Sequence, residues 1–463
     1  MSLVPSRTIG LAVGALFVCV GVLVGIGQGE MALRVSGVLV VVVALAMLPA
    51  YVEAALIAVF FASPVLGVIE ALRPEEINVT FYAVVLLTVA GFMAMLRSKE
   101  KRIDPLLVFL VWLMGNAVVA TAVVKPEPLY LIVAMPLTAL ASYLVVTYGA
   151  PLSRKAYLVG FLVWAGVESC IAVLQTVFNM PGFLRWGSVE FHASRNYFAL
   201  VAPGVSPNVR LATGTFTHFN QLAGLLCMAV PIALGLWLRR KSPVRGLYLA
   251  LVVSGLVCTF SRGGLLGALV GCGIILFVAS RGSLGRRLRL WIGILVAGLA
   301  VLSVESAIES YVSTTQNLAP RMLTWSLVLG QTLADPVHLI SGAGLGYFQL
   351  EFLPGLRGVP LGVHSAPIEL LVETGVVGLA LGTYAVASTC LEGLRRGRWA
   401  EVVLSAGIVA FMLHQLIDNA LFTMTGGVTM GLLSILMYRL REEHDGPAAA
   451  PDDPLRRATD GPP

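Results

Sequence analysis

Charged side chains are scarce in this sequence of 463 residues. Only 12% of the residues are Asp, Glu, Lys or Arg, whereas soluble globular domains carry about 25%. Hydrophobic residues make up 57%, and the mean hydropathy is +0.88. This composition excludes a soluble protein with one membrane anchor and indicates a polytopic membrane protein. The net charge of +6 then reflects basic cytoplasmic loops and not binding to nucleic acid.

Signatures of metal sites and of activated nucleophiles are also missing. The sequence contains no HExxH, CxxC or GxSxG motif. Its six cysteines lie in or beside apolar runs, and none has a neighbour at metal-ligand spacing. We interpret them as small buried hydrophobic residues, with no disulfide and no zinc. We therefore expect no metal and no cofactor, and a metal-free mechanism.

Apolar runs long enough to cross a bilayer as helices recur along the chain. We expect them at 8–28, 33–50, 52–71, 79–96, 104–124, 128–148, 156–178, 217–238, 244–260, 263–280, 287–304, 366–388, 401–421 and 424–440. The second and third runs nearly touch. The sequence thus predicts an all-α polytopic membrane protein with about 12–14 transmembrane helices.

The basic residues give this series of helices an orientation. With the N-terminus in the cytoplasm, most of the 31 Lys and Arg fall in cytoplasmic segments, as the positive-inside rule requires. The clusters are at 97–102, 154–155, 239–245, 281–289, 395–398 and 439–457. Both termini are then cytoplasmic, and Arg210 and Arg262 are among the few basic residues on the outer side.

The resulting organisation has six parts. We expect N-terminal membrane helices over 1–178, an outer loop over 179–214, central helices over 215–304, a large outer loop over 305–365, C-terminal helices over 366–442 and a disordered cytoplasmic tail over 443–463. Within the large loop, 320–335 is expected to be a helix on the outer surface. The glycine-rich GAGLGYF (342–348) predicts a tight turn, or an amide nest that holds an anion.

Polar residues concentrate at the outer ends of the expected helices, where they are costly and by default indicate function. They are His218 and Asn220 in TFTHFNQ (215–221), Arg262 in TFSRGG (259–264), His364 with Glu369 and Glu373 after it, and His414 with Asp418, expected on one helical face. Structural interpretations are snorkelling for Arg262, helix capping for His218 and Asn220, a structural pair for His414 and Asp418, and dipole-favoured acids for the glutamates. Glu168 has no obvious partner, and pairing with an arginine is one interpretation.

Arginines and an exposed histidine suit one kind of chemistry. An arginine binds phosphate oxygens through two parallel hydrogen bonds and keeps its charge. Two arginines can hold a diphosphate and stabilise the negative charge that builds on it as it leaves. A histidine can take the proton of an attacking hydroxyl. The substrate that fits is a lipid-linked diphosphate sugar, and the reaction is glycosyl transfer.

Four motifs in order carry a specific resemblance. RLATGTFTHFNQLAG (210–224), SRGG (261–264), RMLTW with GAGLGYF (321–348) and HSAPIELLVETGVVG (364–378) resemble the O-antigen ligase/polymerase superfamily over roughly residues 200–430. In that family an arginine precedes a GTF turn, and a second follows a serine after the next span. A large periplasmic loop then ends in a histidine that ten residues separate from a glycine, here His364 and Gly375.

The resemblance implies a GT-C-like membrane glycosyltransferase that is inverting and independent of metal. It implies that Arg210 and Arg262 contact the diphosphate of an undecaprenyl-diphosphate glycan, and that His364 is catalytic and activates or orients the acceptor hydroxyl. Supporting residues are expected among His218, Asn220, Glu369, Glu373, His414, Asp418 and Arg321. The acceptor is a glycolipid or glycan at the outer face of a bacterial cytoplasmic membrane.

Other functions stay open from the sequence alone. The leading prediction is a ligase that transfers a whole polysaccharide, and its close rival is a polymerase that joins repeat units on the same carrier. A transporter is the rival from another class, but transporters place ionisable groups near the membrane midplane and often contain repeats. Here most such groups lie at the outer face, and we find no internal repeat. A structural scaffold is the remaining alternative.

Overall fold

The structure is a computed structural model that describes residues 49–70, 79–98, 103–123, 129–177, 212–216, 218–280, 318–346, 365–418, 421 and 423–442. These residues form helices and the turns between them, with no strand in this part of the chain. The prediction of an all-α protein is therefore confirmed for the described residues. The expected spans at 8–28 and 287–304, almost all of the one at 33–50, and the tail over 443–463 lie outside them.

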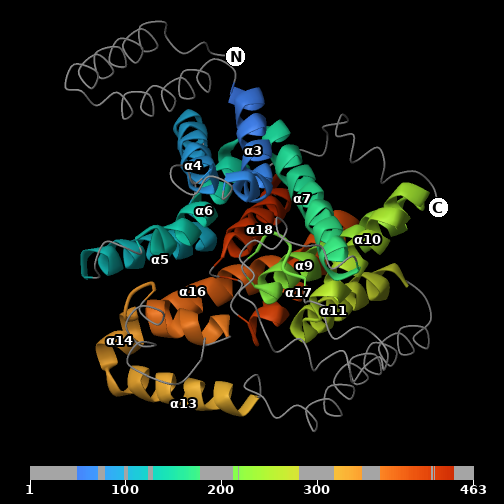
Figure 1. The fold of residues 1–463 in the computed structure, drawn as a ribbon. Coiled ribbons are helices and arrows are strands. Elements are labelled where there is room, and N and C mark those ends of the chain that lie inside the picture. The colour runs from blue at the N-terminus through green and yellow to red at the C-terminus, as the bar shows by residue number, and fades with distance from the viewer. Residues whose placement is uncertain are drawn as a thin grey trace, which may run out of the picture.

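The helices cross one another in a bundle (Figure 1). They are α3 (Pro49–Glu70), α4 (Val79–Arg97), α5 (Pro105–Val123), α6 (Leu129–Tyr148), α7 (Pro151–Val177), α9 (Phe219–Arg239), α10 (Pro243–Thr259), α11 (Arg262–Ala279), α13 (Leu318–Ala334), α14 (Pro336–Ser341), α16 (Ala366–Arg396), α17 (Trp399–Gln415) and α18 (Met424–Glu442).

Eleven of these helices match the expected spans, and α13 matches the helix expected at 320–335. Among the described residues, α7, α9, α11 and α16 are long and apolar enough to cross a membrane. Shorter apolar helices lie within α3, α4, α5, α6, α10 and α17. Local signals explain several starts: proline opens α7 and α10, and the hydroxyl of Ser242 caps α10 by accepting the amide of Arg245.

One end of the bundle collects buried acids and the basic residues that pair with them. The carboxylate of Glu53 forms an ion pair with Arg97 and accepts the hydroxyl of Ser153 at 2.6 Å. Asp104 lies 3.0 Å from a guanidinium nitrogen of Arg441. Each of these acids is almost fully buried, so its partner removes the cost of an isolated charge.

We call this the basic end, defined by Arg97, Arg154, Arg245, Arg396 and Arg441. Hydrogen bonds from side chains to main-chain carbonyls join its helices: the guanidinium of Arg396 donates to the carbonyl of Leu440, and the indole N–H of Trp399 donates to that of Gly235. The opposite end, where α9, α11 and α16 begin and α17 ends, is called the motif end. The described basic clusters of the sequence thus gather at one end of the bundle.

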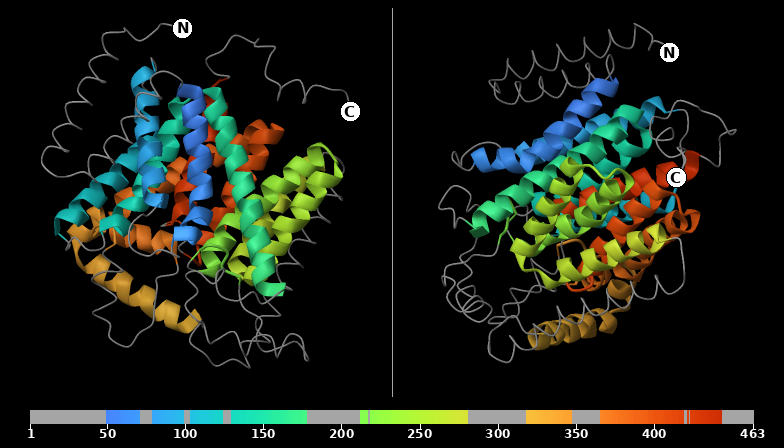
Figure 2. Two further views of the ribbon diagram at one scale, coloured as in Figure 1. Left: turned by 45° about the horizontal axis from the view of Figure 1, so that its top comes forward. Right: turned by 90° about the vertical axis from the view of Figure 1, so that its right-hand side faces the viewer.

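Helices α13 and α14 lie outside the bundle, and all views show α13 apart from the other helices beyond α16 (Figure 1, Figure 2). They pack against α16 at the motif end. This position agrees with the predicted surface helix at 320–335.

Candidate functional site

Arg262 lies in a short elbow between α10 and α11. Helix α10 ends at Thr259, and Phe260 takes a left-handed conformation with φ 52° while its amide donates to the carbonyl of Val257 at 2.9 Å. Ser261 then caps α11 by accepting the amide of Gly264 at 3.4 Å. These two caps reverse the chain within two residues. Arg262 is therefore the first residue of α11, half-buried at the positive end of the helix dipole.

The glycines after Arg262 allow α11 to approach α17 closely. A Cβ atom on Gly263 would lie 2.8 Å from Nδ1 of His414, and one on Gly267 would lie 2.4 Å from the carbonyl oxygen of Ala410. A Cβ on Gly271 would lie 2.8 Å from the carbonyl oxygen of Ala406. Small residues at this spacing are typical of close contacts between membrane helices. The SRGG motif thus places His414 directly behind the elbow.

His414 is fully buried and joins α17 to the start of α9. Its Nε2 atom lies 3.0 Å from the carbonyl oxygen of Asn220. A carbonyl only accepts, so Nε2 carries the hydrogen in this contact. Among the described residues, Nδ1 has no hydrogen-bond partner. His218 caps α9, because its Nδ1 accepts the amide of Asn220 at 3.2 Å, which confirms the capping interpretation.

Asp418 does not share a helical face with His414, so that prediction is wrong. Helix α17 ends at Gln415, where the expected span continued to residue 421. The chain then turns, and the carbonyl of Asp418 accepts the amide of Ala366 at 2.9 Å. The Asp418 side chain is buried. Asp418 therefore connects the end of α17 to the first turn of α16, directly after His364.

Helix α16 is interrupted at Gly375, which has φ 71° and ψ −179°. The interruption frees the carbonyls of the preceding turn. Those of Val372 and Glu373 accept the amides of Ala343 and Gly344 at 2.8 Å and 3.0 Å. That of Thr374 accepts the indole N–H of Trp112 in α5 at 3.0 Å.

The described part of the glycine motif, residues 342–346, is therefore a turn that docks on the interrupted helix. This confirms the first of the two predictions made for it. The amides of Ala343 and Gly344 already bind carbonyls, so these two do not form an anion nest. Glu369 and Glu373 are both buried in the half-helix before the interruption. Glu369 lies in the first turn of α16, where the helix dipole favours an acid.

Residues 212–216, which we call the ATGTF turn, are held by two side chains of α7. The carboxylate of Glu168 accepts the amide of Thr215 at 2.9 Å and also its hydroxyl, as well as the indole N–H of Trp164. The amide oxygen of Gln175 accepts the amides of Thr213 and Gly214 at 3.0 Å and 2.9 Å. The described partners of Glu168 are thus neutral donors and not the arginine considered from the sequence.

Neither α7 residue was a predicted site residue. Glu168 and Gln175 are seven positions apart in an apolar helix, and this spacing places them on one face. Two polar residues on one face of an apolar helix were the sequence signal that could have identified them. Their common partner was not visible, because the ATGTF turn is distant in sequence.

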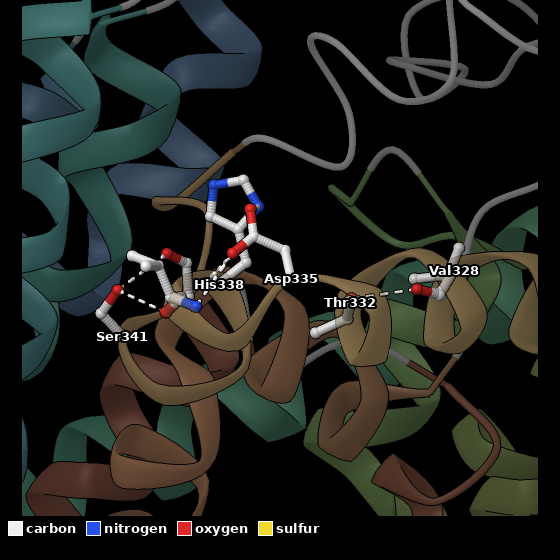
Figure 3. A network of polar contacts seen from close by, with 7 residues as sticks. Val328, Thr332, Asp335, His338 and Ser341 are labelled. Atoms are coloured by element: carbon white, nitrogen blue, oxygen red, sulfur yellow. Dashed lines mark hydrogen bonds and ion pairs between the residues drawn. The ribbon is translucent and has the colours of Figure 1, made fainter.

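A second polar cluster lies between α13 and α14 (Figure 3). One carboxylate oxygen of Asp335 accepts the amides of Val337 and His338 and so caps α14, and the other lies 3.3 Å from Nδ1 of His338. Thr332 donates to the carbonyl of Val328, and Ser341 donates to that of Val337. These contacts lie within residues 328–341, and both Asp335 and His338 are partly exposed.

The structure places several of the predicted site residues at the motif end. His414 contacts the carbonyl of Asn220 and lies against Gly263, the residue after Arg262. Asp418 bonds Ala366 through its carbonyl, and Glu369 lies in the adjoining first turn of α16. Arg321 lies in α13. Arg210 and His364 lie outside the described residues, but Arg210 comes two positions before Ala212, and His364 directly precedes Ser365.

These features define an all-helical membrane protein with its polar site at one end of the bundle. The family model described as O-antigen ligase matches residues 247–383, from the start of α10 into the second half of α16. This match confirms the predicted resemblance to the O-antigen ligase/polymerase superfamily. The matched region includes Arg262 and His364, whereas Arg210 and His414 lie outside it. A comparison with curated proteins gave no match.

Proposed function

We propose that the protein is a metal-independent, inverting glycosyltransferase that moves a glycan from an undecaprenyl-diphosphate carrier to an acceptor hydroxyl. The family match supports a membrane glycosyltransferase of the O-antigen ligase/polymerase type. The observation that carries the finer proposal is a set of hydrogen bonds to main-chain groups at the motif end, one of them made by the His414 side chain. They join segments that are up to about two hundred residues apart in sequence.

Three contacts bring three of the four motifs together. The amide of Ala212 donates to the carbonyl of Cys258 at 3.1 Å, which joins the segment after Arg210 to the segment before Arg262. His414 joins α9 to the elbow through Asn220 and Gly263. Ala366 and Asp418 join the segment after His364 to the turn that follows α17 and His414. The residues expected to bind the diphosphate and to activate the acceptor therefore come from adjoining segments.

The electrostatics of the motif end favour an anionic substrate. Helices α9, α11 and α16 all begin there, around the end of α17. Each helix start carries a partial positive charge and amide groups without a partner in their own helix. Arg262 adds a full positive charge at one of these starts. A diphosphate is the anion that fits two arginines and several helix starts.

The proposed reaction follows from these positions. His364 takes the proton of the acceptor hydroxyl, and the acceptor oxygen attacks the anomeric carbon of the donor sugar. The bond between that carbon and the diphosphate oxygen breaks on the opposite face, so the configuration inverts. Undecaprenyl diphosphate leaves with the electron pair, and Arg210 and Arg262 stabilise the negative charge on its oxygens. The arginines supply this stabilisation without a metal ion.

The distribution of basic residues supports the orientation. The basic end would face the cytoplasm under the positive-inside rule, which leaves the motif end at the outer face of the cytoplasmic membrane. A lipid-linked glycan and its glycolipid or glycan acceptor would meet there. Helices α13 and α14 would then form part of the outer loop above the site.

The interruption in α16 does not favour the transporter alternative. Transporters use interrupted helices to bind ions through freed carbonyls near the midplane. Here the carbonyls of Val372, Glu373 and Thr374 accept hydrogen bonds from Ala343, Gly344 and Trp112. The interruption therefore holds the 342–346 turn in place.

The proposal is tested by purified protein with an undecaprenyl-diphosphate glycan and an acceptor, with EDTA and without divalent metal. Transfer in the wild type and its loss in His364→Ala are expected. Strict dependence on added magnesium would contradict the metal-free mechanism. Ligase and polymerase are separated in a deletion strain: loss of a ligase leaves complete chains on the lipid carrier, and loss of a polymerase leaves single repeats.

A further inference from the structure

Two long polar side chains, those of Glu168 and Gln175, are buried in the apolar part of α7. Glu168 is 0% exposed and Gln175 is 9% exposed. Polar groups at such positions are costly unless hydrogen bonds satisfy them. Seven positions separate the two residues, so both point to the same side of α7. That side faces the ATGTF turn.

Together the two side chains bind three consecutive residues of the turn. Glu168 accepts both the amide and the hydroxyl of Thr215. Gln175 accepts the amides of Thr213 and Gly214 through its oxygen, and its nitrogen donates to the carbonyl of Gly214 at 3.0 Å. An irregular backbone inside a membrane protein needs such partners, because water is not there to supply them.

The shape of the turn is fitted to the carboxylate. Gly214 has φ +59°, and a Cβ atom on it would lie 2.2 Å from Oε2 of Glu168. A side chain there would displace the carboxylate and take up a conformation that L-residues rarely adopt. Contact with α7 thus explains the glycine of the GTF motif. The same contact fixes the position of the turn relative to α7.

The ATGTF turn also holds the two segments that are expected to bind the diphosphate. Ala212, its first residue, donates its amide to the carbonyl of Cys258 at 3.1 Å. Cys258 comes shortly before the elbow that carries Arg262, and Arg210 comes shortly before Ala212. A shift of the turn would therefore be transmitted to both arginine-bearing segments.

We propose that Glu168 and Gln175 are positioning residues for donor binding, acting through the ATGTF turn. The inference rests on the proposed function, because it names the residues that hold its diphosphate site in place. The carboxylate and the amide act at a distance from the reacting atoms. Their loss is expected to weaken donor binding more than it slows the chemical step.

The test compares Glu168→Gln and Thr215→Val with the wild type in the transfer assay. Glu168→Gln keeps the size of the side chain but presents an NH₂ group to one donor of the turn. Thr215→Val keeps the shape and removes only the hydroxyl that Glu168 accepts. Each is expected to raise the donor KM about tenfold, the effect of one buried donor without its acceptor, with a smaller change in kcat.

Two controls separate positioning from folding. Thr215→Ser restores the hydroxyl and should restore the donor KM. Ser169→Ala changes a buried neighbour of Glu168 whose hydroxyl donates within α7, to the carbonyl of Ala165, and should leave the KM within twofold of the wild type. The inference is overturned if Glu168→Gln and Thr215→Val both keep the wild-type KM, or if they lower only the melting temperature.

Equilibrium binding of undecaprenyl diphosphate distinguishes failure of this inference from failure of the proposed function. If the wild type binds the lipid but transfers no glycan, the transferase proposal fails. The inference is then judged by whether Glu168→Gln and Thr215→Val weaken that binding about tenfold. If the wild type neither transfers nor binds, the inference is overturned together with the proposed function.

Discussion

Gly342 and Gly375 lie against each other where the end of α14 meets the interruption in α16. A Cβ atom on Gly375 would lie 2.7 Å from the amide nitrogen of Gly342 and 2.1 Å from the carbonyl oxygen of Ile340. A Cβ on Gly342 would lie 2.2 Å from the carbonyl oxygen of Glu373. This contact attaches α13 and α14 to the half-helix that begins after His364.

Gly375→Ala should destabilise the protein, because alanine rarely adopts this backbone conformation and its methyl group meets Ile340. The conformational strain alone costs about 1–3 kcal/mol. Thermal unfolding of the purified protein measures the effect. Gly330→Ala is the matched control, since nothing lies within 4 Å of that Cβ position, and it should be neutral or stabilising. Equal stability of the two variants would contradict this account of the interruption.

Arg262→Lys should reduce transfer by about 10²-fold or more, the effect of losing one well-placed donor to a charge that develops in the transition state. Lysine keeps the charge but loses the planar pair of N–H groups. Initial rates at saturating and at limiting donor measure the effect. Arg240→Lys, at an exposed position of the basic end, should behave like the wild type. A fully active Arg262→Lys would exclude a two-point contact with the diphosphate.

His364→Ala should lower kcat by about 10²–10⁴-fold, the usual contribution of a general base. His338→Ala is a demanding control, because His338 in α14 is also a histidine and lies beside the carboxylate of Asp335. It should retain transfer within a few-fold. If His338→Ala is inactive and His364→Ala is not, the catalytic histidine has been assigned to the wrong residue.

His414→Leu should lower stability by about 1–3 kcal/mol, because the buried carbonyl of Asn220 would lose its donor. His414→Gln keeps an N–H donor and should recover part of the loss. Asn220→Ala keeps the backbone carbonyl and isolates any separate role of that side chain. Thermal unfolding of the three variants gives the comparison. If His414→Leu is as stable as the wild type, the hydrogen bond from His414 to the carbonyl of Asn220 does not stabilise the fold.

The orientation of the bundle predicts which positions react from outside the cell. In a background without native cysteines, Gly330→Cys in α13 should react with a membrane-impermeant maleimide in spheroplasts. Lys241→Cys, at an exposed position between α9 and α10, should react only after permeabilisation. The reverse pattern would place the motif end in the cytoplasm and remove the proposed site from its substrates.

Sequence alone located the helices well, because a chain that must satisfy its backbone in lipid has few alternatives to a helix. It failed where a helix stops inside a segment that is long enough to be one span. Apolar residues continue on both sides of Glu373, Thr374 and Gly375, so the expected span at 366–388 was predicted as one unbroken helix. The expected span at 401–421 likewise continued past Gln415, and Asp418 was therefore placed on the helical face of His414.

For the candidate site, the sequence indicated several of the residues but not the contacts between distant segments. The sequence identified Asn220, Arg262 and His414, since each is a polar residue at the end of an apolar run. It could not find the partners of Glu168 and Gln175, because both partners lie in a turn about forty residues later. The reason for the glycine in the GTF motif was hidden too, since the atom that requires it belongs to α7.

Main-chain atoms make most of the links between the motifs, as in the contacts of Ala212 with Cys258 and of Ala366 with Asp418. A hydrogen bond between two backbone groups persists when either side chain changes. The scaffold of the site can therefore persist while the surrounding side chains change. Under the proposed function, such changes would alter the sugars and acceptors without moving the segments that carry Arg262 and His364.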